Sequence, residues 1–568
     1  MNDIRRTILW VIFGFSMVLL WDKWQVHNGH KATFFPSPAA VTASAPEGAA
    51  TASAPAAHAS TPAAAPAGTA QGPGGEAAAP VARERVTVTS DVLRLEFDGQ
   101  GGSLVHGELL KYPAMEDKAK PFVLFDDSAS RVYQAQTGLI GGAFPTHKTT
   151  MALVPGPREL KDGEDTLQVR FESPDLGGVK LTKTWTLKRG AYDIAVKHEV
   201  VNTGTAAVSP QLYLQLVRDG NKPAGESSFY STFTGPAVYT EAKKYQKVEF
   251  KDIKAKKFDI PSESTNGYIA MVQHYFASAW LLPDGVPRQL NMEATDIGAS
   301  TPDCCYRVQM ITPVGEIAPG QAKAVDARLF AGPQVEKTLE SLTPGLELVK
   351  DYGMFTILSK PLYWLLDKIH GVLGNWGWSI IGLVLLLKIA FYWLNAKAYA
   401  SMAKMKAINP KIMEMRERLK DKPQQMQQEM MRIYREEKVN PMGGCFPIMI
   451  QIPVFIALYW VLLSSVEIRN APWLGWIHDL SAPDPFFILP LLMTASSLLQ
   501  TALNPAPPDP MQAKMMWIMP LMFSVMFFFF PAGLVLYWLT NNILSIAQQW
   551  IINKRMGVPP QFNLPKFR

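Results

Sequence analysis

The sequence is poor in cysteine and in the residue patterns that carry most enzyme chemistry. Three cysteines in 568 residues are too few for a disulfide framework. Cys304 and Cys305 are adjacent, so a bridge between them would be strained, and we expect packed or unreactive thiols. No GxSxG, HExxH or Walker A motif is present, and no His/Cys cluster has metal-site spacing. We therefore predict a protein that is not an enzyme, without a cofactor or metal, driven by hydrophobic transfer, membrane potential or a partner.

Charge is nearly absent from several long apolar runs near both ends of the chain. Arg5 and Arg6 precede the first run, and no small-x-small cleavage site follows it closely. We predict that residues 1–25 form an uncleaved signal-anchor transmembrane helix with a cytoplasmic N-terminus, the alternative being a cleaved signal peptide. Residues 26–82 are mostly Ala, Pro, Ser, Thr and Gly, a composition that cannot build a core and predicts a flexible tether.

The middle of the chain, residues 83–340, has the patterning of β-strands. Apolar and polar residues alternate in residues 85–89, 92–97, 167–171 and 179–187, with Gly, Pro, Asn and Asp between such runs. This period of two predicts antiparallel strands and favours a β-sandwich. The orientation of the anchor would place this domain outside the cytoplasm, in the periplasm.

Residues 341–374 are apolar but too often interrupted by charges to cross a membrane. We predict an amphipathic helix at the outer membrane surface. The alternative is a connector packed on the β domain.

The C-terminal part contains the main predicted membrane spans. The uncharged run from Met515 to Ile552 is longer than the ~20 residues that one span needs, and Pro531 supplies a break. We expect two helices there, the first notably short. The predicted spans, which with the anchor make six transmembrane helices, are residues 375–395, 441–463, 486–503, 515–530 and 531–552.

Basic residues set the topology of the segments between these spans. Residues 396–440 hold 11 Lys/Arg against 6 Asp/Glu, and are predicted to be a cytoplasmic helical hairpin. With six spans every basic cluster is cytoplasmic, whereas five would expose the C-terminal charges outside. The remaining predicted segments are a periplasmic loop (464–485), a cytoplasmic loop (504–514) and a cytoplasmic tail (553–568).

Lys388 is a charge inside the second predicted span. A charge at mid-helix costs about 2.5–3.5 kcal/mol on insertion scales. One interpretation is a lysine that reaches the inner interface with its ammonium; the other is a water-accessible cavity with a polar lining. Single polar residues of the other spans are explained by interhelical hydrogen bonds, but together they suggest a groove. They are Gln451, Thr494, Gln500, Ser524, Thr540, Asn541, Asn542 and Gln548.

The predicted hairpin has apolar residues at helical spacing on both of its arms. Two interpretations stay open: the apolar stripes hold the hairpin together, or exposed methionines contact apolar nascent segments. The basic excess could also contact ribosomal RNA or lipid headgroups. The methionines concerned are Met402, Met405, Met415, Met426 and Met430.

Four segments resemble the YidC/Oxa/Alb family of membrane protein insertases: residues 401–411, 438–447, 476–482 and 530–537. The anchor, tether and β domain are similar to the Gram-negative YidC type in architecture. The resemblance implies an α-helical membrane protein with a five-helix insertase core, a large periplasmic supersandwich-like β domain, and a hydrophilic groove open to cytoplasm and lipid.

The resemblance also implies a set of groove residues. Lys388 stands where the family has an arginine, so the charge is kept without the bidentate fork. Tyr392 is followed by Trp393 instead of the family's usual proline. The expected groove set is Lys388, Tyr392, Gln451, Pro453, Tyr537, Thr540, Asn541 and Asn542.

The same resemblance implies partners and a location. The partners are nascent membrane proteins, the Sec translocon, the ribosome and signal recognition particle pathway, and the lipid bilayer, without a small-molecule substrate. The location is the bacterial inner membrane, with several spans and both termini in the cytoplasm.

Two other functions remain open from the sequence. One is a transporter or channel in which Lys388 binds a small anion, although no inverted repeat and only one intramembrane charge are found. The other is a membrane-anchored carbohydrate enzyme, although no convincing pair of carboxylates is found.

Overall fold

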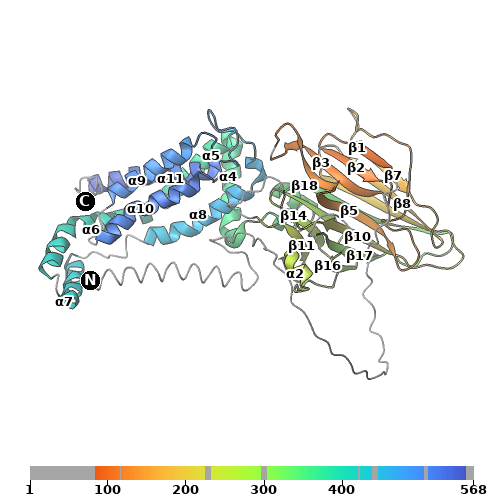
Figure 1. Ribbon diagram of the computed structural model, residues 1–568, viewed down its shortest axis with the longest axis horizontal. Coiled ribbons are helices and arrows are strands. Elements are labelled where there is room, and N and C mark those ends of the chain that lie inside the picture. Colours follow the sequence, from red (N-terminus) through yellow and green to blue (C-terminus); the bar gives the residue numbers. More distant parts are fainter. Residues whose placement is uncertain are drawn as a thin grey trace, which may run out of the picture. The chain divides into compact units, whose positions relative to one another are not determined.

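The computed structural model describes residues 84–115, 117–223, 232–295, 304–419, 422–437, 446–504 and 510–557 (Figure 1). The predicted anchor at 1–25 and tether at 26–82 lie outside these ranges. The described chain begins as β-strands and continues from residue 336 as helices.

The first β-sheet has nine strands in the order β1-β2-β3-β4-β5-β10-β17-β16-β13. Its neighbouring strands run antiparallel. The strands are β1 (Arg85–Thr89), β2 (Leu93–Asp98), β3 (Ser103–Pro113), β4 (Pro121–Ser128), β5 (Arg131–Ile140), β10 (Gln211–Arg218), β13 (Glu263–Ser264), β16 (Arg288–Ala294) and β17 (Tyr306–Pro313).

The second sheet also has nine strands, in the order β12-β11-β14-β15-β18-β9-β8-β7-β6. It too is antiparallel. The strands are β6 (Ala152–Leu153), β7 (Thr166–Glu172), β8 (Val179–Lys188), β9 (Asp193–Asn202), β11 (Gly235–Thr240), β12 (Lys244–Lys247), β14 (Tyr268–Gln273), β15 (Phe276–Leu281) and β18 (Ala322–Pro333); a short helix, α2 (Phe250–Lys254), follows β12.

The alternation seen in the sequence separates buried from exposed positions. In β7, Leu167, Val169 and Phe171 are buried while the residues between them are exposed. Side chains of both sheets meet in one core, where the Trp185 ring lies 5.0 Å from Phe97 and 6.1 Å from Trp280. The prediction of an antiparallel β-sandwich is therefore confirmed, with β1, β2, β7 and β8 at the four alternating runs.

Cys304 and Cys305 lie just before β17, and both side chains pack beside Val132 and Val217. The expectation of packed cysteines is therefore confirmed for this pair.

The predicted amphipathic segment at 341–374 is not one continuous helix. It comprises the end of α3 (Glu336–Leu342), two short 3₁₀ turns, η1 (Leu346–Val349) and η2 (Gly353–Phe355), and α4 (Thr356–Leu373). Gly345 and Gly353 have φ of 82° and 66°, a left-handed conformation that interrupts a helix. α4 packs on helices α5 and α8, while Ile357, Trp364 and Val372 of α4 are exposed.

The predicted span at 375–395 is bent within its length. α5 (Trp376–Ala390) ends at Phe391, and α6 (Tyr392–Arg418) continues at an angle of 69°. The bend therefore lies inside the predicted span, and α6 continues through residue 396, where the hairpin was expected to begin. Phe391 adopts φ −92° and ψ 10°, outside the helical region, although no proline or glycine marks the bend.

α6 and α7 (Pro423–Glu436) form the predicted hairpin around a small apolar cluster. Ile408, Ile412 and Met415 are buried in it, and Met405, Met426 and Met430 are half-buried beside them. The interpretation that the stripes hold the hairpin together is therefore confirmed. The exposed-methionine interpretation is wrong for Met415, and the exposed methionines of the hairpin are Met413 and Met431.

The remaining helices agree with the predicted order. They are α8 (Phe446–Ser464), followed by η3 (Val466–Ile468), then α9 (Ile488–Leu503), α10 (Pro510–Phe527) and α11 (Ala532–Arg555). The break at Pro531 is confirmed. α10 has 18 residues, where a notably short helix was expected, and it includes the end of the predicted loop 504–514.

Among the described helices, none is by itself long and apolar enough to cross a membrane, whereas α5 and the first part of α6 together reach that length and hydropathy as a bent pair. α11 occupies the middle of the helical region, since it packs on α9, α5 and α6.

Candidate functional site

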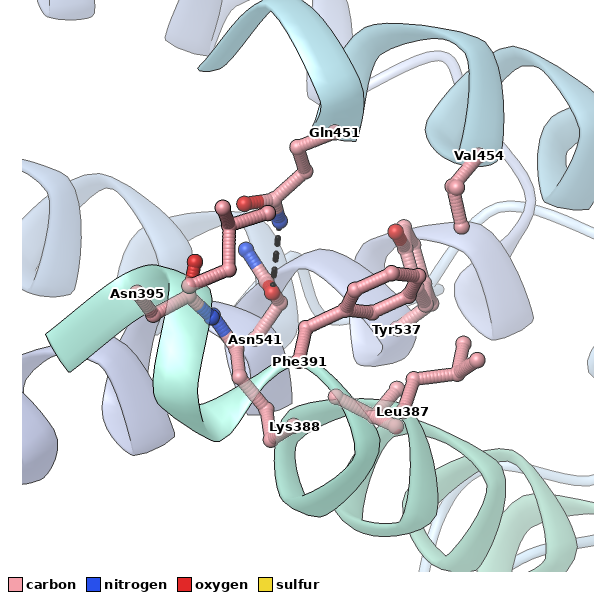
Figure 2. A pocket seen from close by; sticks show the side chains of 10 residues that line it. Leu387, Lys388, Phe391, Asn395, Gln451, Val454, Tyr537 and Asn541 are labelled. Carbon is pink, nitrogen blue, oxygen red and sulfur yellow. Dashed lines mark hydrogen bonds between the residues drawn. The ribbon is translucent and has the colours of Figure 1, made fainter. Parts of the chain in front are cut away.

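Lys388 of α5 faces a small cavity of about 40 Å³ between helices (Figure 2). Its Nζ donates a hydrogen bond to Ser545 Oγ of α11, at 2.7 Å. The Ser545 hydroxyl donates in turn to Asn541 O at 2.7 Å, so its lone pair is available to the ammonium. The cavity is lined by Val384, Leu387, Lys388, Phe391, Leu394, Asn395, Gln451, Val454, Tyr537 and Asn541.

An amide pair crosses the cavity from α8 to α11. Gln451 Nε2 donates to Asn541 Oδ1 at 2.8 Å, and Figure 2 shows the two side chains reaching toward each other. One helical turn away on each helix, the Phe455 ring lies 5.9 Å from Tyr537 and 4.3 Å from Trp538. Amide and aromatic contacts thus join α8 to α11 at successive levels.

Four of the eight expected groove residues line this cavity: Lys388, Gln451, Tyr537 and Asn541. They come from α5, α8 and α11, which are distant in the sequence. The structure therefore brings together the central half of the expected set.

The other four expected residues lie elsewhere. Tyr392 is 44% exposed, and Pro453 lies within α8 without lining the cavity. Thr540 Oγ1 donates to Leu536 O of its own helix at 2.8 Å. Asn542 Nδ2 donates to the hydroxyl of Ser497 on α9 at 2.9 Å. Thr540 and Asn542 do not line the cavity because their polar groups are hydrogen-bonded elsewhere, to the carbonyl of Leu536 and the hydroxyl of Ser497.

Thr494 and Ser524, also considered as lining, bond in the same way to carbonyls of their own helices, Pro490 O and Pro520 O. Gln548 Nε2 lies 3.4 Å from Tyr392 O. None of the three is among the lining residues.

Ser545, Phe391 and Asn395 were not identified from the sequence. Ser545 follows Asn541 by one helical turn, a spacing that places two residues on one helix face. Asn395 lies on α6, beyond the bend at Phe391, so helical spacing from Lys388 does not locate it. A search for polar residues one helical turn from Asn541 would have found Ser545.

The ten lining residues include one charged side chain, Lys388, and no carboxylate. A positive charge in a space walled by apolar side chains is poorly screened and attracts anionic groups more strongly than one in water. No nucleophile with an adjacent general base lines the cavity. Within the described ranges no group of His, Cys, Asp and Glu could hold a metal ion. The lining therefore offers one positive charge and neutral polar groups.

Two family models match the chain. The YidC periplasmic domain matches residues 85–365, and the 60Kd inner membrane protein family matches residues 368–558. Proteins described as "Membrane protein insertase YidC" are similar along almost the whole chain. The one from Cupriavidus metallidurans is 57% identical and that from Ralstonia nicotianae 54% identical, each over 98% of both chains.

A solved structure of an active YidC insertase, with its first transmembrane domain resolved, is 17% identical with a TM-score of 0.38, covering 82% of this chain and 91% of that one. By the two family models and the identity of its relatives, the chain belongs to the YidC family of inner-membrane proteins.

Proposed function

We propose that this protein inserts other proteins into the bacterial inner membrane and helps them to fold there, without catalysing a covalent reaction. The observation that carries the proposal is the position of Lys388, the one charge among the residues lining a cavity between α5, α8 and α11. The relatives described as insertases support the same function. In the proposed topology, with six spans, the β domain is periplasmic and both termini are cytoplasmic.

The proposed path begins at the cytoplasmic side of the groove. An acidic or polar tail of the substrate enters, attracted by the poorly screened ammonium of Lys388. The apolar segment of the substrate then moves into lipid, and membrane potential acting on the charge of the tail assists its transfer.

Exposed apolar side chains support a path beside α8 and α10. Several long apolar side chains stand exposed on α10 and one on α8, as they would against lipid or an apolar substrate segment. They are Ile452, Ile518, Met519, Leu521, Met522, Phe523 and Val525.

The proposed partners are nascent membrane proteins, the Sec translocon, and the ribosome with the signal recognition particle pathway. The basic α6–α7 hairpin supports the ribosomal contact, because an excess of Lys and Arg suits a polyanionic surface.

Insertion of a small single-span protein with an acidic tail, in cells depleted of their own insertase, tests the function. Protease protection of the tail measures insertion for wild type, Lys388→Arg, Lys388→Ala and Lys388→Glu. We expect wild type and Lys388→Arg to insert the protein and Lys388→Glu to fail, since the charge near the tail is reversed. Lys368→Glu, a reversal at an exposed position of α4, is the matched control and should insert normally.

The outcomes separate the parts of the proposal. Normal insertion by Lys388→Glu would refute the electrostatic step and leave hydrophobic transfer as the mechanism. Failure of well-expressed wild type, together with ion flux through liposomes that contain this protein alone, would favour a channel instead.

A further inference from the structure

The seam between α8 and α11 is narrow and has two levels. At one level the rings of Phe455, Tyr537 and Trp538 pack together. At the other, one turn along each helix, Gln451 and Asn541 share a single hydrogen bond beside the cavity. Elsewhere α8 packs extensively on α4, and α11 on α9 and α5. The contact between α8 and α11 is thus the less extensive one.

The two levels differ in strength. The aromatic level is a packed contact, and the Tyr537 side chain is buried. The amide level is one neutral hydrogen bond bordered by empty space, and such interhelical bonds contribute little to the stability of membrane proteins. Separation of the helices would therefore begin at the amide level, with the aromatic level as the pivot.

Resting on the insertase function proposed above, we infer that Gln451 and Asn541 form a latch that opens when a substrate segment enters the cavity and then binds its backbone. Each freed amide presents both donor and acceptor groups, as a peptide group does. A chain crossing an apolar environment needs partners for its own N–H and C=O groups. Recognition by amides is independent of substrate sequence, whereas Lys388 selects for charge.

A second amide pair on α11 provides a matched control. Gln549 Nε2 donates to Asn504 Oδ1, just beyond the end of α9, at 3.1 Å. Neither residue lines the cavity. The control pair has the same chemistry and lies on the same helix, but it joins α11 to a different neighbour.

Reversible cross-linking tests the latch. Gln451→Cys/Asn541→Cys and Gln549→Cys/Asn504→Cys are built in a chain whose three native cysteines are replaced by serine. Each full-length protein is closed with a short bis-methanethiosulfonate, assayed for insertion, and assayed again after reduction. We expect the closed 451/541 pair to fall to background and to recover on reduction, while the closed 549/504 pair inserts as its open form does.

Contrary results are equally specific. Insertion by the closed 451/541 pair at the level of its open form would overturn the latch, while wild-type activity in the same assay would leave the insertase function intact. Absence of insertion by wild type itself would overturn the proposed function and the latch with it.

Capture of a substrate tests the second half of the inference. A ribosome-stalled single-span chain with one cysteine is exposed to oxidant in the presence of Gln451→Cys, Asn541→Cys or Gln549→Cys. We expect disulfides with the cysteines at 451 and 541 and none with that at 549, for acidic and uncharged tails alike. Capture of acidic tails alone, or equal capture at all three positions, would contradict recognition of the backbone by the latch.

Discussion

Lys183, which is buried, and Lys388, which is half-buried, show how differently the β domain and the helical region use a charge. Lys183 of β8 is fully buried, and its Nζ donates to Gly101 O at 2.5 Å and Thr137 O at 2.7 Å. Lys388 of α5 has one hydroxyl partner, Ser545, and borders a cavity. Burial lowers the pKa of Lys183 to about 7, so its charge is held at a free-energy cost.

The comparison teaches that burial of a charge does not by itself indicate function. Lys183 is surrounded by packed side chains of the sandwich core, and its two carbonyl partners leave no room for a ligand. Lys388 has capacity left for further hydrogen bonds, since an ammonium carries three donors. The empty space beside the charge, more than the charge itself, indicates the site.

The largest expected effect tests whether the two regions are energetically separate. Trp185→Ala removes a ring that touches Phe97 and Trp280 in the β core. We expect it to reduce the free energy of unfolding of the β domain by about 3–5 kcal/mol. Hydrogen exchange of the full-length protein should show faster exchange in β8 and β9 and unchanged exchange in α11. Leu176→Ala, at a partly exposed side chain, is the control.

A rise in the exchange rate of α11 as large as that in β8 would break the comparison. It would mean that the sandwich and the helices unfold as one unit.

The next prediction compares the replacement of each lysine by methionine. Lys183→Met leaves two buried carbonyls without donors and should lower the stability of the β domain by about 1–3 kcal/mol, with insertion retained by the folded protein. Lys388→Met should do the reverse and reduce insertion of acidic-tailed substrates while leaving exchange in the β domain unchanged. Loss of insertion in both variants at equal folded protein would contradict the distinction between them.

The pH dependence of the Lys183 effect has a definite sign. The pKa of this lysine is about 7 when folded, against an ordinary value of 10.5. Between these values the unfolded chain binds the additional proton, so the stability of the wild type rises with pH. The advantage of wild type over Lys183→Met, measured by hydrogen exchange corrected for intrinsic rates, should therefore grow from about pH 7 upward. An advantage that shrinks with pH would show that the lysine is charged in the folded core throughout.

The sequence predicts the strands well because a half-buried strand has a local pattern, the alternation of apolar and polar residues. The alternation at residues 166–172 is sufficient to locate β7. The pairing of the strands cannot be predicted in this way. β5 lies beside β10, and β16 lies between β13 and β17, but no local sequence pattern identifies these neighbours.

The site is predictable in part for the same reason. Lys388 is conspicuous in an apolar run, and Gln451 and Asn541 are amides in such runs. Thr540 gives an equal sequence signal, but its hydroxyl bonds to Leu536 O, a choice set by the rotamer and not by the pattern. No proline or glycine marks the bend at Phe391, so the direction of α6 could not be predicted from the sequence.

The smallest expected effect concerns how Lys388 is held. Ser545→Ala removes the hydroxyl that accepts from Nζ at 2.7 Å, and the freed ammonium can then extend toward the interface. Loss of one such bond corresponds to about 0.5–1.5 kcal/mol. We therefore expect insertion of acidic-tailed substrates to fall by about two- to tenfold, less than for Lys388→Ala, with no loss for uncharged tails.

Two variants separate positioning of the charge from simple packing. Ser545→Thr keeps the hydroxyl and should restore insertion, whereas Thr540→Val removes a hydroxyl bonded only within α11 and should have no effect on the acidic substrate relative to the uncharged one. Protease protection of both substrates gives the ratio that decides. If Ser545→Ala lowers insertion of both substrates equally, Ser545 acts through helix packing. If it lowers insertion of neither substrate, the walls of the cavity hold the ammonium in place without Ser545. The empty space beside Lys388 is then the only difference from Lys183 that bears on insertion.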